Sequence, residues 1–236
     1  MSATASSSSV RSVTLRRLRK IVKNGGRTLE IGCGNASSLL GPLSRRCQAY
    51  GADLTMEMLV LSKQHSAISA LVRSDACYLP FQDHSFDFVY TSRCIINVPT
   101  REMQRQALGE AFRVAKPDAL VVFIENFEEP VERMNLAKER FHAGPREIDR
   151  HNIHLNLNDT LRYAQELGWH PASIRGNTLV SLVAQVLVPK FTPRRGSGLV
   201  QRLLHPFYVG LSYLDDWMGA RLPLVGKDIM VVLKRG

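Results

Sequence analysis

The chain has 236 residues, of which 44% are hydrophobic, and a formal net charge of +10. This length and composition allow one α/β domain with a full core and exclude a chain that is disordered throughout. The four cysteines lie far apart without a Cys-x-x-Cys pair, so neither a zinc site nor a disulfide framework is indicated, and a reducing cytoplasm is the expected compartment.

The first residues are rich in serine. Residues 1–9 lack the apolar core of a signal peptide, and we expect a disordered lead before a single domain over residues 10–236. Leu15, Leu18, Ile21 and Val22 then share one face of a helix that ends at a pair of glycines. No run in the chain is long enough and apolar enough to predict a span of a bilayer.

A short strand ending at Ile31 leads into the loop GCGNASS. Gly32 and Gly34 allow a tight turn and a close approach of backbone to a ligand, and the start of the next helix offers free N–H groups. A dinucleotide fingerprint needs a third glycine, and the Glu30 carboxylate would repel a pyrophosphate. The loop therefore favours a nucleoside-like cofactor that carries positive charge.

Strands and helices alternate after this loop. The pattern predicts a helix over 39–47 that breaks near Gly41, a strand ending at Asp53, a helix over 56–69, a strand ending near Asp75, a strand over 85–92, a helix over 101–115 and a strand over 119–126. Residues 127–158 look polar and irregular, a helix runs up to Gly168, and a last strand lies within 225–236. This alternation predicts a mostly parallel sheet with helices on both faces.

Polar side chains stand where the predicted strands end: Glu30, Asp53, Asp75, Ser92 and Glu125. The carboxyl ends of parallel strands form the edge at which ligands bind. Asp53 follows the glycines by about 20 residues, the distance at which a carboxylate accepts both ribose hydroxyls. Helix capping or turn formation is the structural alternative for Asp53 and Asp75, and a structural hydrogen bond is the alternative for Glu30.

Four stretches carry a family resemblance: LEIGCGNASSL, GADLTMEML, RSDACYLPFQDHSFDFVY and ALGEAFRVAKPDALVVFIE. Over about Leu15 to Asn126 they resemble, in order and spacing, the motifs of class I S-adenosylmethionine-dependent methyltransferases. The resemblance implies a Rossmann-like fold with a mostly parallel seven-stranded sheet, helices on both faces and S-adenosylmethionine as cofactor. The cofactor-binding residues that it implies are Glu30, Gly32, Gly34, Asp53, Leu54, Asp75, Ala76 and Ser92. Ala36 departs from the family by replacing the usual last glycine of the first motif, and Asp118-Ala119 replaces the usual Gly-Gly.

The second half must supply the methyl acceptor site. The stretches SRCIINVP, IENFEE, RMNLAKERFHAGP and RHNIHLN resemble a subgroup associated with modification of surface glycans and other sugars. The acceptor-binding residues that this resemblance implies are Arg93, Asn97, Glu125, Asn135 and Asn152. A sugar hydroxyl must lose a proton, which suits a neutral imidazole, so His151 is the first candidate for the base and His154 the second. A structural ring bonded to backbone is the alternative for each, and no metal-ligand cluster is visible.

These observations favour a cytoplasmic methyltransferase that O-methylates a sugar, a glycan or another small-molecule hydroxyl. One alternative is an RNA or amine N-methyltransferase, although TSRCIINVP lacks the Asn/Asp-Pro-Pro-aromatic signature of amino-methylating nucleic-acid enzymes. Nucleic acid is therefore the less favoured partner. Another alternative is a regulatory subunit that binds the cofactor without catalysis, since binding and turnover use the same loop.

Positive charge gathers in two stretches without acids, residues 11–27 and residues 167–214. Within the domain we expect a cofactor-binding half over 10–126, an acceptor region over 127–177, an apolar and basic helical insertion over 178–224, and a last strand over 225–236. We favour the insertion as a lid or as a homodimer contact. The alternative is an interfacial helix that brings the site to a lipid-linked acceptor at an anionic membrane.

Overall fold

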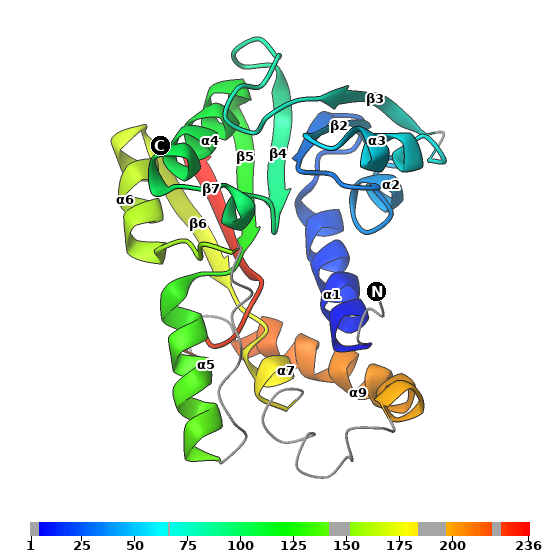
Figure 1. Cartoon of the computed structure of the whole chain (residues 1–236), viewed down its shortest axis with the longest axis vertical. Helices are drawn as coiled ribbons and strands as arrows, with labels where there is room; N and C mark the ends of the chain where they lie inside the picture. The colour runs from blue at the N-terminus through cyan, green and yellow to red at the C-terminus, as the bar shows by residue number, and fades with distance from the viewer. Residues whose placement is uncertain (1–4, 66, 142–151, 184–196, 219–222) are drawn as a thin grey trace.

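Seven strands form one sheet in the order β3-β2-β1-β4-β5-β7-β6 (Figure 1). The computed structural model describes residues 5–65, 67–141, 152–183, 197–218 and 223–236. The strands are β1 Arg27–Ile31, β2 Gln48–Asp53, β3 Ile68–Arg73, β4 Phe86–Ser92, β5 Ala115–Glu125, β6 Trp169–Arg175 and β7 Ile229–Arg235. The first five strands pair in parallel, and β7 runs antiparallel to both β5 and β6. The predicted Rossmann-like, mostly parallel sheet is therefore confirmed.

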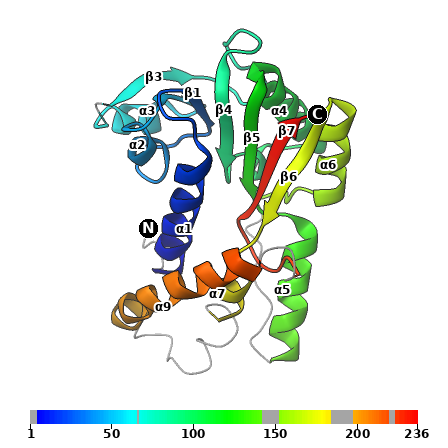
Figure 2. The same ribbon diagram turned by 180° about the vertical axis from the view of Figure 1, so that it is seen from behind.

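Helices cover both faces of this sheet (Figure 2). On one face lie α1 Ala5–Ile21, α2 Leu40–Leu43 and α3 Met56–Ser62; on the other lie α4 Arg101–Val114 and α6 Leu157–Glu166. Alternate residues of β5 divide between the two cores, because Val122 packs in the cluster of α1–α3 and Val121 in that of α4 and α6. Both sides of the central strands are thus buried, as parallel strands require.

Among the described residues, three helices lie beyond the sheet edge at which β4 and β5 end: α5 Glu128–Arg140, α7 Thr178–Leu182 and α9 Ser197–Met218 (Figure 1). The short 3-10 helix η1, Ile95–Asn97, follows β4 at the same edge. The insertion predicted over 178–224 is helical in its described parts, α7 and α9. Side chains of α1 bond to α9, so the N-terminal and C-terminal segments pack together.

Several local expectations differ from the structure. The helix expected over 56–69 ends at Ser62, and residues 68 and 69 belong to β3; the helix expected over 39–47 spans only Leu40–Leu43. Helix α1 begins at Ala5, so residues 5–9 are helical rather than disordered, because extending an existing helix costs little compared with nucleating one. Helix α5 occupies a segment that looks irregular in sequence, and it buries only Val131 and Met134 as large apolar side chains. Strand β6 escapes prediction because it contains a proline and three polar residues and lacks a regular apolar alternation, which is tolerated at the edge of a sheet.

Candidate cofactor and acceptor site

The glycine loop lies where the strand order reverses, between β1 and β4. Gly32 has φ +73°, and a Cβ on it would lie 2.4 Å from Cys94 Sγ, so the loops after β1 and β4 are in close contact. Gly34 has φ +53°, yet no heavy atom lies within 4 Å of the Cβ position. The loop is therefore closed on the Cys94 side and open at Gly34, where a ligand can approach its backbone.

Asp53 ends β2 and contacts the open part of this loop. Its Oδ2 accepts a hydrogen bond from Gly34 N at 2.7 Å, and its Oδ1 accepts one from Thr55 N at 2.9 Å. The second hydrogen bond closes a turn, as expected if Asp53 has a structural role. A carboxylate has about four acceptor positions, so lone pairs remain for two ribose hydroxyls. Leu54, the next residue, is 61% exposed.

Glu30 is buried beneath the loop. Its Oε2 accepts hydrogen bonds from Leu40 N at 3.1 Å and from the Tyr90 hydroxyl at 2.9 Å. Burial raises the pKa of Glu30 to about 8. The geometry is that of the structural hydrogen bond, in which Glu30 ties the start of α2 to β4 and supports the loop from below.

Glu125, at the end of β5, is the second buried acid. Its Oε1 accepts hydrogen bonds from Thr91 Oγ1, Cys94 N and Ile95 N, and Oε2 has no partner. Burial raises the pKa of Glu125 to about 7. In this arrangement Glu125 fixes the turn that follows β4, and its side chain is fully buried rather than presented to an acceptor.

These two acids give a pH dependence of stability. Both folded-state pKa values lie above the ordinary value of 4.5, so the folded chain keeps protons that the unfolded chain has lost between about pH 4.5 and pH 8. Their contribution to the free energy of unfolding therefore falls as pH rises through this range.

In Glu30→Gln we expect a smaller drop in melting temperature between about pH 5 and pH 8 than in the wild type. Glu57→Gln, at an exposed position on α3, should keep the wild-type slope, and an unchanged slope in Glu30→Gln would contradict the assignment.

The other predicted cofactor residues lie at the same edge. Asp75 Oδ1 accepts a hydrogen bond from Cys77 N at 2.9 Å, which closes a turn, as expected if Asp75 has a structural role. Ala76 is partly buried against the core. Ser92 lines a cavity of about 40 Å³ together with Arg93, Ile124, Asp228 and residues of α1 and the glycine loop.

The loop after β4 holds two of the predicted acceptor residues. Arg93 has φ +53°, and its Nε lies 4.0 Å from Oδ1 of Asp228, which has φ +54°. Asn97 Nδ2 donates a hydrogen bond to the Arg93 carbonyl at 2.7 Å. A left-handed backbone is unfavourable for residues other than glycine, so a strained turn presents the half-exposed Arg93 at the sheet edge.

The remaining acceptor candidates are dispersed. Asn135 lies on α5, where its Oδ1 is buried without a partner. Asn152 is half-buried in a coil next to Ile153, whose N donates to the Ile96 carbonyl of η1 at 2.9 Å. The backbone carbonyl of His154 accepts a hydrogen bond from Arg101. His151 lies outside the described residues.

Several polar residues at this edge escape the sequence-based prediction. The hydroxyls of Tyr90 and Thr91 bond to Glu30 and Glu125, and Asn126 Oδ1 accepts a hydrogen bond from Asp228 N at 3.1 Å. The available signal was the pair of hydroxyl residues that directly follows the apolar residues Phe88 and Val89 in a central strand. Within the described part of the chain, no group of three or more His, Cys, Asp or Glu side chains is placed to hold a metal ion.

A larger cavity, of about 460 Å³, lies between α4 and α6. Its lining includes Arg101, Arg105, Tyr163 and Glu166 and no residue of the glycine loop. Size alone therefore does not identify the cofactor site, since the loop, Asp53 and Ser92 lie elsewhere.

The sheet order and the loop at its reversal define a class I methyltransferase fold. Residues 29–123 match the family model described as a methyltransferase domain. A demethylmenaquinone methyltransferase of Staphylococcus epidermidis is 36% identical over 110 residues, which are 44% of this chain and 44% of that protein. One of Bacillus mycoides is 33% identical over 112 residues, 44% and 46% of the two chains. The chain thus aligns with less than half the length of these curated relatives.

Solved structures share the fold over more of the chain. A SAM-dependent methyltransferase from Archaeoglobus fulgidus superposes with a TM-score of 0.60 at 19% identity and covers 95% of this chain and 94% of its own. A geranyl diphosphate C-methyltransferase from Streptomyces coelicolor superposes with a TM-score of 0.59 at 12% identity. This match covers 97% of this chain and 79% of that protein. The described residues therefore have the class I methyltransferase fold, and residues 29–123 match the methyltransferase domain family, whose cofactor is S-adenosylmethionine.

Proposed function

We propose that the chain is a methyltransferase that O-methylates a hydroxyl of a sugar, a glycan or another small molecule in the cytoplasm. The observation that carries the methyltransferase part is the contact between Asp53 and Gly34, beside open space, at the reversal of strand order. The acceptor class rests on amide, guanidinium and imidazole candidates in the second half, groups that suit hydroxyl-rich ligands. Lipid-linked glycans belong to this class.

The residues at the sheet edge fit the cofactor. S-adenosylmethionine supplies a methyl group on a positively charged sulfur. Asp53 would accept the ribose hydroxyls, and Asp75 with the Ala76 amide would bind the adenine. Glu30 would support the loop from below, and the open backbone at Gly34 would face the methionine part. Ser92 would lie beside the cofactor, next to the acceptor loop.

The acceptor would be held by residues after β4 and β5. Methyl transfer is an in-line displacement, so orientation contributes much of the rate. Arg93, Asn97, Asn135 and Asn152 would orient the acceptor, with Glu125 fixing the loop that carries Arg93. The base is His151, and His154 is its alternative; a positioned neutral imidazole takes the proton from the attacking hydroxyl.

A second candidate is C-methylation of a quinone-like small molecule. The observation that favours it is the identity of about one third with proteins named demethylmenaquinone methyltransferases. The matched length is less than half of each chain, so the identity supports a shared cofactor half more strongly than a shared acceptor. RNA or amine N-methylation and a regulatory role without catalysis are further alternatives, and the basic charge supports the first of them.

Methyl-labelled cofactor offered with separate pools of nucleotide sugars, glycolipids, demethylated quinones and RNA distinguishes these functions. We expect label in a sugar or glycolipid pool, at an oxygen. Label in the quinone pool alone would establish the second candidate, and label in RNA would overturn the small-molecule proposal. Cofactor binding without label in any pool or in a small-molecule extract would favour the regulatory role. Asp118→Ala, at an exposed site near the start of β5, serves as the active control.

A further inference from the structure

The outward side of α9 is an apolar surface. In the described part of this helix the exposed residues are Pro206, Phe207, Gly210, Tyr213, Leu214 and Trp217, and none of them is charged. We call these six residues the α9 outer face. At about 100° per residue they cover roughly 120° of the helix circumference, a continuous stripe. Trp217 is 75% exposed and Tyr213 55%, which is unusual for side chains of this size.

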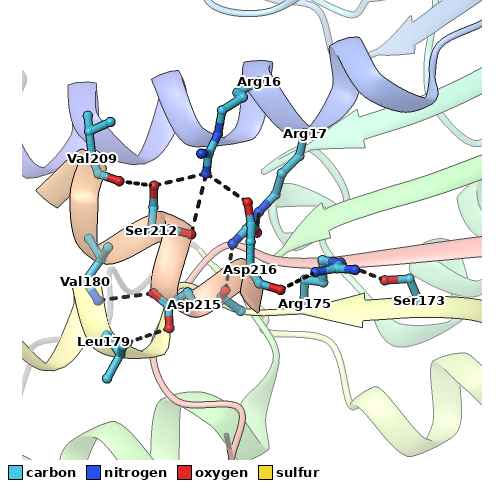
Figure 3. A network of polar contacts seen from close by, with 11 residues as sticks. Arg16, Arg17, Ser173, Arg175, Leu179, Val180, Val209, Ser212, Asp215 and Asp216 are labelled. Atoms are coloured by element: carbon cyan, nitrogen blue, oxygen red, sulfur yellow. Dashed lines mark hydrogen bonds and ion pairs between the residues drawn. The ribbon is translucent and has the colours of Figure 1, made fainter. Parts of the chain in front are cut away.

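Polar contacts on the inner side hold this surface outward (Figure 3). Arg16 of α1 donates to Ser212 Oγ at 3.0 Å and pairs with Asp216 at 2.9 Å, and Arg17 pairs with Asp216 at 2.7 Å. Asp215 accepts hydrogen bonds from Leu179 N and Val180 N at the start of α7. The two acids of α9 are thus engaged on the inner side, and turning the outer face inward would break these contacts.

The chain as a whole is strongly basic, with a formal net charge of +10. Residues 11–27, most of them in α1, which packs against α9, contain seven lysines and arginines and no acid. A second copy of the chain docked on this face would bring together two chains of the same positive charge, which is unfavourable. An anionic lipid surface complements them, and tryptophan and tyrosine are the residues enriched at the level of lipid headgroups. None of the helices in the described residues is both long and apolar enough to cross a membrane.

We propose that the α9 outer face binds an anionic membrane surface, with α9 lying in the plane of the interface. The helix lies at the end of the molecule toward which β4 and β5 point, so this contact turns the ligand edge of the sheet toward the bilayer (Figure 1). Aromatic and aliphatic side chains enter the headgroup region, and the positive net charge of the chain attracts anionic lipid. The proposal does not depend on the identity of the methyl acceptor.

Flotation with vesicles tests this surface. The full chain is mixed with vesicles of phosphatidylcholine alone, or of equal parts phosphatidylcholine and phosphatidylglycerol. We expect recovery with the anionic vesicles, weakening as salt is added, and little recovery with the neutral ones. The double variant Leu214→Ser/Trp217→Ser should lower the partition coefficient by about tenfold or more. Met58→Ser/Val60→Ser removes two exposed apolar side chains from α3 instead and should leave partitioning unchanged.

Three results would overturn the proposal: equal recovery with both vesicle types, unchanged partitioning of the α9 variant, or equal loss in the α3 variant. Sedimentation without lipid adds a fourth, because a wild-type dimer that the α9 variant dissociates would assign the face to a second copy. S-adenosylhomocysteine binding is measured in each variant. Preserved cofactor binding with lost flotation in the α9 variant shows that the effect concerns the membrane contact and not the methyltransferase site.

Discussion

Replacing His151 with glutamine is expected to lower the turnover number by about 10²–10⁴-fold, the usual contribution of a positioned general base. Affinity for the cofactor should stay at the wild-type value, because the cofactor contacts lie in the first half of the chain. The backbone of Ile153, the second residue after His151, makes two hydrogen bonds: its N donates to the Ile96 carbonyl, and its carbonyl accepts from Gln104 Nε2 at 2.8 Å. These bonds hold the chain two residues after His151 against η1, beside the loop that carries Arg93.

The pH profile separates His151 from His154. The wild-type rate should rise with pH through an apparent pKa near 6.5, that of an ordinary imidazole. His154→Gln should keep both this profile and most of the turnover; their loss in that variant would transfer the role to His154. Near-normal turnover in both single variants would exclude both histidines as the base. Catalysis would then rest on positioning or on another group, with Glu125→Gln the next variant to measure.

Replacing Asp53 with alanine is expected to weaken S-adenosylhomocysteine binding by roughly 10–150-fold, since a charge-assisted hydrogen bond contributes about 1.5–3 kcal/mol. Asp53→Asn keeps the size and some acceptor capacity of the side chain, so it should lose less affinity for S-adenosylhomocysteine than Asp53→Ala. Calorimetric titration measures both affinities. The side chain also holds Gly34 N and Thr55 N, so the unfolding temperature of each variant is measured in parallel.

Asp118→Ala is the matched control, because it removes one exposed carboxylate near the amino-terminal end of β5. It should bind S-adenosylhomocysteine as the wild type does. A folded Asp53→Ala variant whose affinity lies within about twofold of wild type would show that Asp53 is a turn residue only.

The sheet was predictable because its information is local. Apolar strands, turn residues and amphipathic helices alternate from β1 to β5, and each unit buries its own face. The positions at the strand ends followed from topology, since parallel strands end at one edge. Ala36 replaces the usual last glycine of the first motif, yet it has φ +57°, a left-handed backbone that favours glycine. The loop conformation is thus retained at a cost in stability on the order of 1 kcal/mol.

The partners of the buried acids were not predictable in this way. In the sequence, Glu30 is predicted to place a negative charge beside a ligand. In the fold it is buried against Tyr90 and Leu40, and this burial raises its pKa. That outcome depends on which strand lies next to β1, a long-range pairing that the local pattern does not contain. The same holds for Glu125, whose donors come from the turn after β4.

The second half carries weaker local signals. Helix α5 has few apolar residues, and β6 is an edge strand without a regular apolar alternation. The sequence of α9 is largely apolar and does not indicate which side of the helix faces α1. The orientation of α9 follows from its ion pairs with Arg16 and Arg17, residues about 200 positions away in sequence. Only the assembled fold reveals that its aromatic side faces outward.

Calorimetric titration of the wild-type chain with S-adenosylhomocysteine tests the central claim most directly. A class I methyltransferase domain with Asp53 and Gly34 at its ligand edge should bind this product at one site per chain, with near one-to-one stoichiometry. Binding should also raise the unfolding temperature, because a ligand that binds only the folded state stabilises it. A well-folded sample that gives neither binding heat nor a thermal shift at saturating ligand would contradict the account.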